Sequence, residues 1–265
     1  MTSGTGGHLQ FSRVVLLGAA CTTTRLVAQA LKEEGVLVRI VIPGRRTWVQ
    51  RQRLRMKRRK LTGTLSFLAC AVAAKALHRL RGGLQREQEL LSDIGLADEW
   101  PQDVDRITVP SVNHEACASA INDVSPDLVV VNGTDIIKEP TLEAIRAPLV
   151  NTHTGITPDY RGAHGGFWAA LNDDATRLGV TLHRIDRGVD TGEVIGQAIV
   201  SYDPQRDGLN TIPLLQYMAG IGLLREFVRF GRSTGPLPGS KGSKQWRTPG
   251  LVPYLKAVAK GKIAY

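Results

Sequence analysis

Residues 13–43 read RVVLLGAACTTTRLVAQALKEEGVLVRIVIP, and this stretch decides the fold class. Residues 13–18 form an apolar run that ends at a glycine, which is typical of a buried strand. Residues 22–34 place apolar side chains at helical spacing, and residues 37–43 form a second apolar run. A strand, a helix and a strand at this spacing predict a βαβ unit, and therefore a parallel sheet.

The same patterns continue along the chain. Further strands are expected at 127–132, 147–151, 180–185 and 194–200, and further helices at 114–123, 163–171 and 211–230. Strands that alternate with helices favour an open, Rossmann-like α/β sheet, mostly parallel, with helices on both faces.

This pattern predicts three parts of the chain. Residues 1–12 are polar and are expected to be flexible, and residues 13–205 are expected to form the main α/β domain. A basic helical insert is expected at about 44–85. Residues 206–265 should contain a helix and then, from Gly231, an irregular tail rich in Gly, Ser, Pro and Lys.

Composition narrows the class of protein. The chain has 265 residues, of which 42% are hydrophobic and 22% charged, so disorder, collagen and a whole-chain coiled coil are poor interpretations. Three scattered cysteines suggest neither a disulfide framework nor a metal site. The first residues lack the features of a secretory signal, and the apolar stretch 65–74 is too short to span a bilayer. We therefore expect a cytoplasmic protein without a metal.

Positive charge is concentrated in one segment. The formal net charge of the chain is +10. Residues 45–81 contain twelve Lys or Arg and no Asp or Glu, whereas the rest of the chain contains 22 basic and 24 acidic residues. Residues 62–80 have helix-like apolar spacing. The segment could be a solvated helical arm over the core or an amphipathic helix at the inner surface of an anionic membrane. A nucleic-acid-binding patch is less favoured, because aromatic residues that could stack on bases are scarce. A phosphate-bearing substrate is compatible with each of these three interpretations of the segment.

Polar residues follow the predicted strands. Asn151 and His153 alternate at a strand end, so both side chains can point into one cleft. Pro158 and Gly162 define the loop beyond them, and residues 186–192 (DRGVDTG) form a second, glycine-framed loop. The chain lacks the G-x-G-x-x-G fingerprint of dinucleotide-binding folds and the phosphate loop of nucleotide hydrolases.

Asn, His and Asp together can support acyl transfer. An amide can donate a hydrogen bond to a developing oxyanion, and a histidine can move a proton near neutral pH. An aspartate can orient that histidine and stabilise its charged form. No Ser or Cys nucleophile accompanies them, which favours direct attack by an external amine.

The two motifs resemble those of the folate-dependent formyltransferases, the family that includes glycinamide ribonucleotide transformylase, methionyl-tRNA formyltransferase and amino-sugar N-formyltransferases. The matching residues are Asn151-Thr152-His153, Pro158, Arg161-Gly162 and the loop 186–192. The resemblance covers residues 13 to about 200. It implies that Asn151, His153 and Asp190 are catalytic and that 10-formyltetrahydrofolate is the formyl donor.

The resemblance also implies further binding positions. The family holds its pterin ring through two backbone segments, which correspond here to Thr134, Asp135, Ile136 and Ile137 and to Asp186, Arg187, Gly188 and Val189. Tyr160 and Arg161 are candidates to line the acceptor cleft, with a surface-loop role as the alternative. His164 is a candidate contact of the acceptor or donor, with capping or packing as the alternative.

Departures from the family pattern bear on the acceptor. Gly155 stands where the family often has Ser, and the phosphate loop of the glycinamide enzyme is absent after the first strand. The 75 residues after Asp190 look too few for a tRNA-binding domain. An amino sugar that is nucleotide- or lipid-linked is the acceptor left by elimination.

Other functions remain open at this stage. The same site with water as acceptor would make a formyltetrahydrofolate hydrolase, and a methionyl-tRNA type of acceptor is a further alternative. A non-catalytic relative could use the basic segment 45–81 to bind a membrane or nucleic acid. The sequence leaves open the acceptor, the oligomeric state and the roles of the basic insert and the tail.

Overall fold

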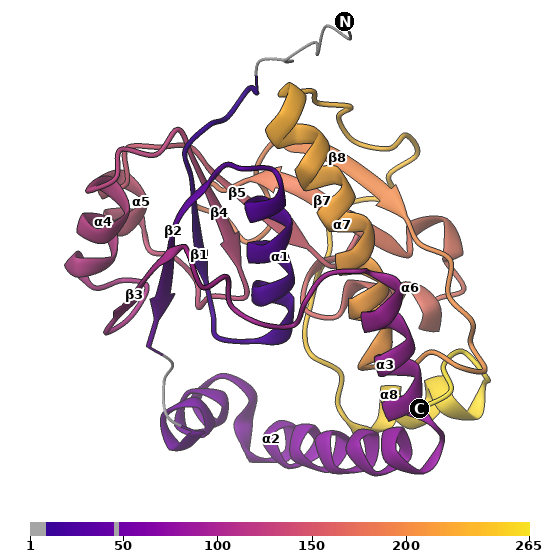
Figure 1. Ribbon diagram of the computed structural model, residues 1–265. Helices are drawn as coiled ribbons and strands as arrows, with labels where there is room; N and C mark the ends of the chain where they lie inside the picture. The colour runs from indigo at the N-terminus through magenta and orange to yellow at the C-terminus, as the bar shows by residue number, and fades with distance from the viewer. Residues whose placement is uncertain (1–8, 45–47) are drawn as a thin grey trace, which may run out of the picture.

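A computed structural model describes residues 9–44 and 48–265, with the backbone alone for residues 48–61. Seven strands form one sheet in the order β3-β2-β1-β4-β5-β7-β8 (Figure 1). The first five of these are parallel, and β7 and β8 are antiparallel to their neighbours. The strands are β1 (Val14–Gly18), β2 (Leu37–Pro43), β3 (Asp105–Val109), β4 (Leu128–Asn132), β5 (Leu149–His153), β7 (Gly179–Arg184) and β8 (Val194–Ile199). The predicted open, mostly parallel sheet is confirmed.

Helices cover both faces of this sheet, as predicted. The α-helices of the described residues are α1 (Thr22–Glu33), α2 (Trp48–Leu80), α3 (Gly83–Asp93), α4 (Glu115–Asn122), α5 (Glu139–Ala144), α6 (Gly165–Leu171), α7 (Thr211–Phe230) and α8 (Leu251–Ala259). Two short strands, β6 (Arg161–Gly162) and β9 (Gln245–Trp246), pair separately from the main sheet.

Alternation along the strands divides the core between the two faces. Val14 and Leu16 of β1 point to the face covered by α1 and α7, whereas Val15 and Leu17 point to the face covered by α4 and α5. All four side chains are fully buried. A strand that is buried on both faces needs the continuous apolar run seen in the sequence.

A third apolar cluster lies at one end of the molecule, where α2, α6 and α8 pack together. Tyr254 of α8 and Phe167 of α6 are buried in it, together with Cys70 of α2. Helix α2 extends along the edge of the molecule (Figure 1). Within the part of the chain that the structure describes, no helix is both long and apolar enough to cross a bilayer.

The two ends of the chain differ from prediction. The tail predicted as irregular contains β9 and the helix α8. Of the residues expected to be flexible, 1–8 lie outside the described part, but Gln10 and Phe11 donate backbone hydrogen bonds to the carbonyls of Arg229 and Val228. The Phe11 ring also packs against Phe227, with centroids 5.1 Å apart. Residues 10 and 11 are therefore held against α7.

Candidate active site

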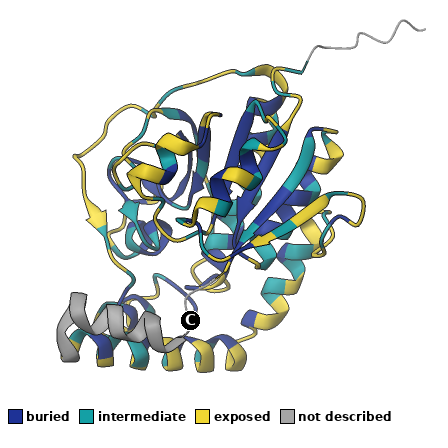
Figure 2. Ribbon diagram, turned by 90° about the vertical axis from the view of Figure 1, so that its left-hand side faces the viewer, coloured by how far each residue is buried: buried dark blue, intermediate teal, exposed yellow. Residues whose placement is uncertain are grey.

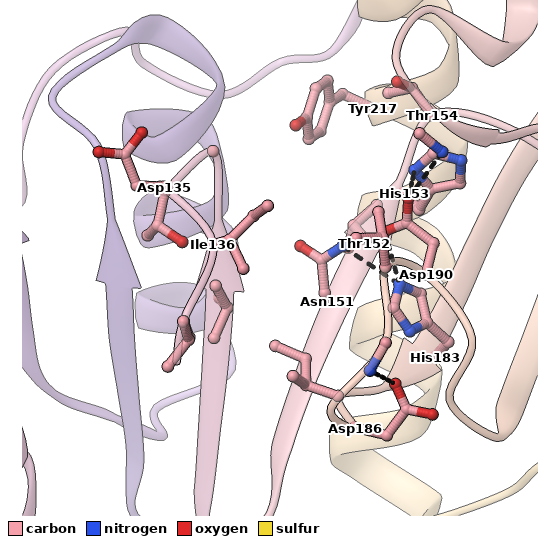
Figure 3. A pocket seen from close by; sticks show the side chains of 18 residues that line it. Asp135, Ile136, Asn151, Thr152, His153, Thr154, His183, Asp186, Asp190 and Tyr217 are labelled. Atoms are coloured by element: carbon pink, nitrogen blue, oxygen red, sulfur yellow. Dashed lines mark hydrogen bonds and ion pairs between the residues drawn. The ribbon is translucent and has the colours of Figure 1, made fainter. Parts of the chain in front are cut away.

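The carboxyl ends of β4 and β5 open into a pocket of about 280 Å³ (Figure 3). It lies next to the point where the strand order changes direction, between β1 and β4. In open α/β sheets ligands bind at such switch points, because the helices on either side of them leave in opposite directions. The two predicted motifs meet in this pocket: Asn151, His153 and Asp190 all line it.

Asn151 is oriented by a histidine from the neighbouring strand. In the antiparallel pairing of β5 with β7, Asn151 lies directly opposite His183. The two side-chain nitrogens, Asn151 Nδ2 and His183 Nε2, are 3.2 Å apart, and His183 Nδ1 is 2.7 Å from the carbonyl oxygen of Arg184. Because a carbonyl can only accept, His183 Nδ1 carries the proton and Nε2 accepts from Asn151. One hydrogen of the Asn151 amide is thus used, and the second remains for a ligand.

His153 is held from both sides of its ring. Its Nε2 donates to the backbone carbonyl of Tyr160 at 2.7 Å, and its Nδ1 lies 3.4 Å from Oδ2 of Asp190. Burial lowers the pKa of His153 and outweighs the opposing effects of Asp190 and the Tyr160 carbonyl. The neutral ring therefore carries its proton on Nε2, and Nδ1 is the atom that can accept a proton.

Asp190 joins the two motifs. It sits at a backbone φ of 51°, and its Oδ2 accepts a hydrogen bond of 2.8 Å from the backbone N–H of Gly162. Its Oδ1 lies 3.6 Å from His183 Nε2. Burial would raise the pKa of Asp190, but the His183 and His153 rings in their charged forms, together with the Gly162 N–H, outweigh it and lower that pKa below the ordinary value. Asp190 is thus a carboxylate placed beside His153 Nδ1.

Local hydrogen bonds hold the loops around the three candidate catalytic residues, Asn151, His153 and Asp190, which we call the trio. Oδ1 of Asp186 accepts from the backbone N–H of Gly188 at 2.9 Å and from the Thr191 hydroxyl at 2.7 Å, which closes the loop that carries Asp190. Gly162 has a φ of 96°, and a Cβ there would lie 2.2 Å from the carbonyl oxygen of Trp246. Only glycine fits this position, whose N–H holds Asp190.

The candidate donor-binding residues divide into two groups. Seven of them line the pocket together with the trio: Thr134, Asp135, Ile136, Ile137, Asp186, Gly188 and Val189. Figure 3 shows Asp135 and Ile136 across the pocket from Asn151 and His153. Arg187 is the exception, because its side chain is exposed and pairs with Glu139 at 2.7 Å and Glu143 at 3.2 Å outside this pocket.

The candidate acceptor-binding residues do not line this pocket. Tyr160 is buried, its ring stacks on Trp246, and its hydroxyl donates to Asp174 at 3.0 Å. Arg161 donates from Nη1 to the carbonyl of Val189 at 3.0 Å. Burial lowers the pKa of His164, the N-cap residue of α6, to about 4, so its ring is neutral at neutral pH.

His183 belongs to neither sequence motif, yet its ring lies against both Asn151 and Asp190. Tyr217 of α7 was not singled out either, and it lines the pocket near Thr154 (Figure 3). Burial raises the pKa of Tyr217 to about 12, so its hydroxyl stays protonated. The role of His183 follows from its position directly opposite Asn151, and this position is known only when the pairing of β5 with β7 is known.

The C-terminal tail supports the loop that carries these contacts. Backbone N–H groups of Arg161 and Ala163 donate to the carbonyls of Lys244 and Trp246. The Trp246 indole donates to the carbonyl of Asp159 at 3.0 Å and lies between the rings of Tyr160 and Trp168. A distant segment therefore fixes the loop whose carbonyl and N–H groups hold His153 and Asp190.

Gly155 is required by this arrangement. A Cβ there would lie 2.4 Å from the Tyr160 carbonyl oxygen and 2.7 Å from His153 Nε2, the two atoms whose hydrogen bond holds the imidazole. We predict that Gly155→Ser lowers kcat about tenfold to a hundredfold, because the ring must shift. Steady-state kinetics would measure this, with Gly222→Ser as the control, since a Cβ at Gly222 meets nothing within 4 Å. Equal rates in both variants would contradict the prediction.

The environment of His153 makes a second prediction. Its ring should titrate below about 6.5, the ordinary midpoint of histidine, and Asp190→Asn should lower the midpoint further, because the carboxylate favours the charged ring. Histidine NMR titration would measure both values, with resonances assigned by single substitutions of the six histidines. A midpoint above 6.5, or an upward shift in Asp190→Asn, would count against the described geometry.

The fold and the site together define an α/β enzyme whose switch-point pocket carries an amide, an imidazole and a carboxylate suited to acyl transfer. The chain belongs to the formyl transferase family: the family model described as "Formyl transferase" matches residues 12–212.

Relatives of known sequence and structure agree with this family. The chain is 32% identical over 101 residues to a methionyl-tRNA formyltransferase from Finegoldia magna, an alignment that covers 38% of this chain and 32% of the relative. It is 34% identical over 88 residues to the same enzyme from Geobacter metallireducens, covering 33% and 28%. The chain thus spans about a third of the length of these curated relatives.

Solved structures share the fold. A sugar N-formyltransferase from Shewanella sp. superposes with a TM-score of 0.53 at 13% identity, covering 94% of this chain and 87% of that one. Phosphoribosylglycinamide formyltransferase from Streptococcus pneumoniae gives 0.50 at 21% identity, covering 82% and 97%. A sugar 3N-formyltransferase, solved in the presence of dTDP and 5-N-formyl-THF, gives 0.50 at 14% identity, covering 89% and 70%.

Proposed function

We propose that this chain transfers a formyl group from 10-formyltetrahydrofolate to an amine on a nucleotide- or lipid-linked amino sugar. One observation carries the proposal: Asn151, His153 and Asp190, which come from two distant motifs, line one pocket at the switch point of the sheet. The family to which the chain belongs supports the reaction class.

The donor would bind along the wall opposite the trio. The segments 134–137 and 186–189 line the pocket, apart from the Arg187 side chain, and offer backbone N–H and C=O groups to a flat heterocycle. Ile136 is 62% exposed at this wall and adds an apolar surface. The folate supplies the formyl group when bound.

Asn151 would stabilise the charge that forms during transfer. When an amine adds to a formyl carbonyl, negative charge develops on the carbonyl oxygen. The Asn151 amide keeps one N–H for this oxygen, because its other hydrogen is donated to His183. A donor fixed in place before the reaction stabilises the charge without reorganisation.

His153 would accept the proton that the attacking amine must lose. Its Nδ1 is the unprotonated nitrogen of the neutral ring, and Asp190 lies 3.4 Å away to stabilise the imidazolium that results. The Tyr160 carbonyl continues to hold Nε2 throughout, so the ring need not turn. The imidazolium would then return the proton to the folate nitrogen as the bond between that nitrogen and the formyl carbon breaks, which releases tetrahydrofolate and the formamide.

An acceptor screen tests the proposal. The purified chain would be incubated with 10-formyltetrahydrofolate and a panel of amines: amino-sugar nucleotides, lipid-linked amino sugars, glycinamide ribonucleotide and methionyl-tRNA. Mass spectrometry should find one added formyl group on an amino sugar and none on the others. Formylation of glycinamide ribonucleotide alone would contradict the proposed acceptor class.

Methionyl-tRNA is the second candidate acceptor. The two curated relatives named above are methionyl-tRNA formyltransferases, and residues 45–81 are strongly basic. Methionyl-tRNA in the same screen would separate the two acceptors. Release of formate without any formylated amine would instead indicate a formyltetrahydrofolate hydrolase.

A further inference from the structure

Helix α2 presents three large apolar side chains to solvent. Leu65, Val72 and Leu80 are 56%, 70% and 81% exposed. The fully buried residues of its described part are small or polar, namely Thr64, Cys70, Ala74 and His78, whereas Phe67, Leu68 and Leu77 are half-buried. An ordinary amphipathic helix on a protein surface keeps its large apolar side chains toward the core, so the exposed apolar side of α2 is unusual.

The exposed apolar residues form one continuous stripe. We call it the α2 face: Leu65, Ala69, Val72, Ala76 and Leu80, which succeed one another at steps of three or four residues and therefore share one side of the helix. All five are exposed. Figure 2 shows exposed residues recurring along this helix at the edge of the molecule.

Exposed apolar groups are concentrated here. Among the described residues nine large hydrophobic side chains are exposed, and four of them lie between Leu65 and Leu84. Two more, Val252 and Leu255, belong to α8, which packs beside α2: the backbone N–H of Leu251 donates to the Ser66 hydroxyl at 3.0 Å. Concentrated apolar surface of this kind marks an interaction site rather than the scattered exposure normal for a protein.

The charges around the α2 face select the partner. Lys75 and Arg79 are exposed on the same helix, and residues 45–81 contain no Asp or Glu. A second copy of the chain docked through the same face would bring Lys75 and Arg79 against their equivalents with no acidic residue of α2 to offset them. An apolar stripe on a helix that carries only positive charge complements a surface that is apolar inside and negatively charged outside.

We propose that the α2 face binds the surface of an anionic membrane, with the helix lying in the plane of the interface. The apolar side chains would enter the boundary between headgroups and acyl chains, while Lys75 and Arg79 reach the anionic headgroups. Among the residues of α2 whose side chains the structure describes, 62–80, none lines the pocket at the carboxyl ends of β4 and β5. The inference is therefore independent of the proposed formyl transfer.

Vesicle sedimentation tests the proposal on the full chain. Vesicles of phosphatidylcholine with 30 mol% phosphatidylglycerol would be compared with vesicles of phosphatidylcholine alone, at roughly 50 and 500 mM salt, where screening differs strongly. The chain should sediment with the anionic vesicles at low salt and dissociate at high salt.

Two variants separate the apolar and charged contributions. Val72→Ser/Leu80→Ser and Lys75→Gln/Arg79→Gln should each weaken partition to anionic vesicles by about tenfold or more. The matched controls are Ile199→Ser, an apolar residue 46% exposed on β8, and Arg146→Gln/Arg232→Gln, two exposed basic residues outside α2. Both controls should bind as the unmodified chain does. All the changed side chains are exposed, so thermal unfolding should be unaffected.

Several outcomes would overturn the proposal. These are no binding to anionic vesicles, equal binding to neutral vesicles, or unchanged binding by the α2 variants, which would leave the contact to another segment. Sedimentation equilibrium would also overturn it by showing a dimer that Val72→Ser/Leu80→Ser dissociates. Formyl transfer measured without vesicles should be the same in all variants, so loss of membrane binding and loss of activity are separate results.

Discussion

Asn151→Ala should lower kcat by about a hundredfold to a thousandfold, the usual cost of removing one oxyanion donor. The substitution removes the amide that His183 aims into the pocket and leaves the donor-binding segments 134–137 and 186–189 in place. The Kd for the folate should therefore change little. Single-turnover kinetics with saturating donor and acceptor would measure the transfer step directly.

Asn122→Ala is the matched control for this experiment. Asn122 donates to the carbonyl of Ala144 at 2.8 Å and lies outside the pocket. Its loss should affect stability more than rate. If Asn151→Ala retained nearly full kcat, the amide would have no role in the transfer step.

His153→Ala should lower kcat by about a hundredfold to ten-thousandfold, the range that general acid–base catalysis contributes. The variant loses the only imidazole nitrogen that faces Asp190 Oδ2 at 3.4 Å within the described part of the chain. Added imidazole should restore part of the rate if the missing function is proton transfer. Steady-state assays with and without imidazole would show this.

His114→Ala is the corresponding control, because His114 caps α4 away from the pocket. Its kcat should equal that of the unmodified chain. An undiminished rate in His153→Ala would remove the proposed proton acceptor from the reaction.

The strands that consist of continuous apolar runs could be predicted from the sequence. Strands with few apolar residues and exposed side chains could not. The run LVVVN of β4 is buried along its whole length, so its pattern predicts a strand. In β3 (DRITV) only Val109 is buried, because this strand lies at the edge of the sheet, and no pattern marks it. In α8, Pro253 suggests a break, yet a proline in the first turn of a helix costs no hydrogen bond.

The site was predictable where its residues lie in compact motifs. Alternation placed Asn151 and His153 on one side of a strand, and the resemblance added Asp190. The role of His183 depends on the antiparallel register of β5 with β7, which no local pattern encodes. The direction of the Tyr160 side chain depends on Trp246, 86 residues later in the chain, whose ring stacks on it.

The orientation of α2 could not be predicted from the sequence. Helical spacing predicted an apolar stripe on residues 62–80 but not which side of the helix would face the core. The basic cluster at 51–60 lies among residues whose side chains the structure does not describe. The orientation is decided by α8 and α6, which accept Cys70 and Ala74 of α2 into their cluster.

The most direct measurement follows a labelled formyl group through one turnover. With 10-[¹³C-formyl]tetrahydrofolate and an amino-sugar nucleotide, ¹³C NMR should show the label moving to a formamide with the unmodified chain. Asn151→Ala should bind the same donor and leave the label on it. A label that never reaches any amine with the unmodified chain, or that moves as fast with Asn151→Ala, would contradict the assignment of the trio to formyl transfer.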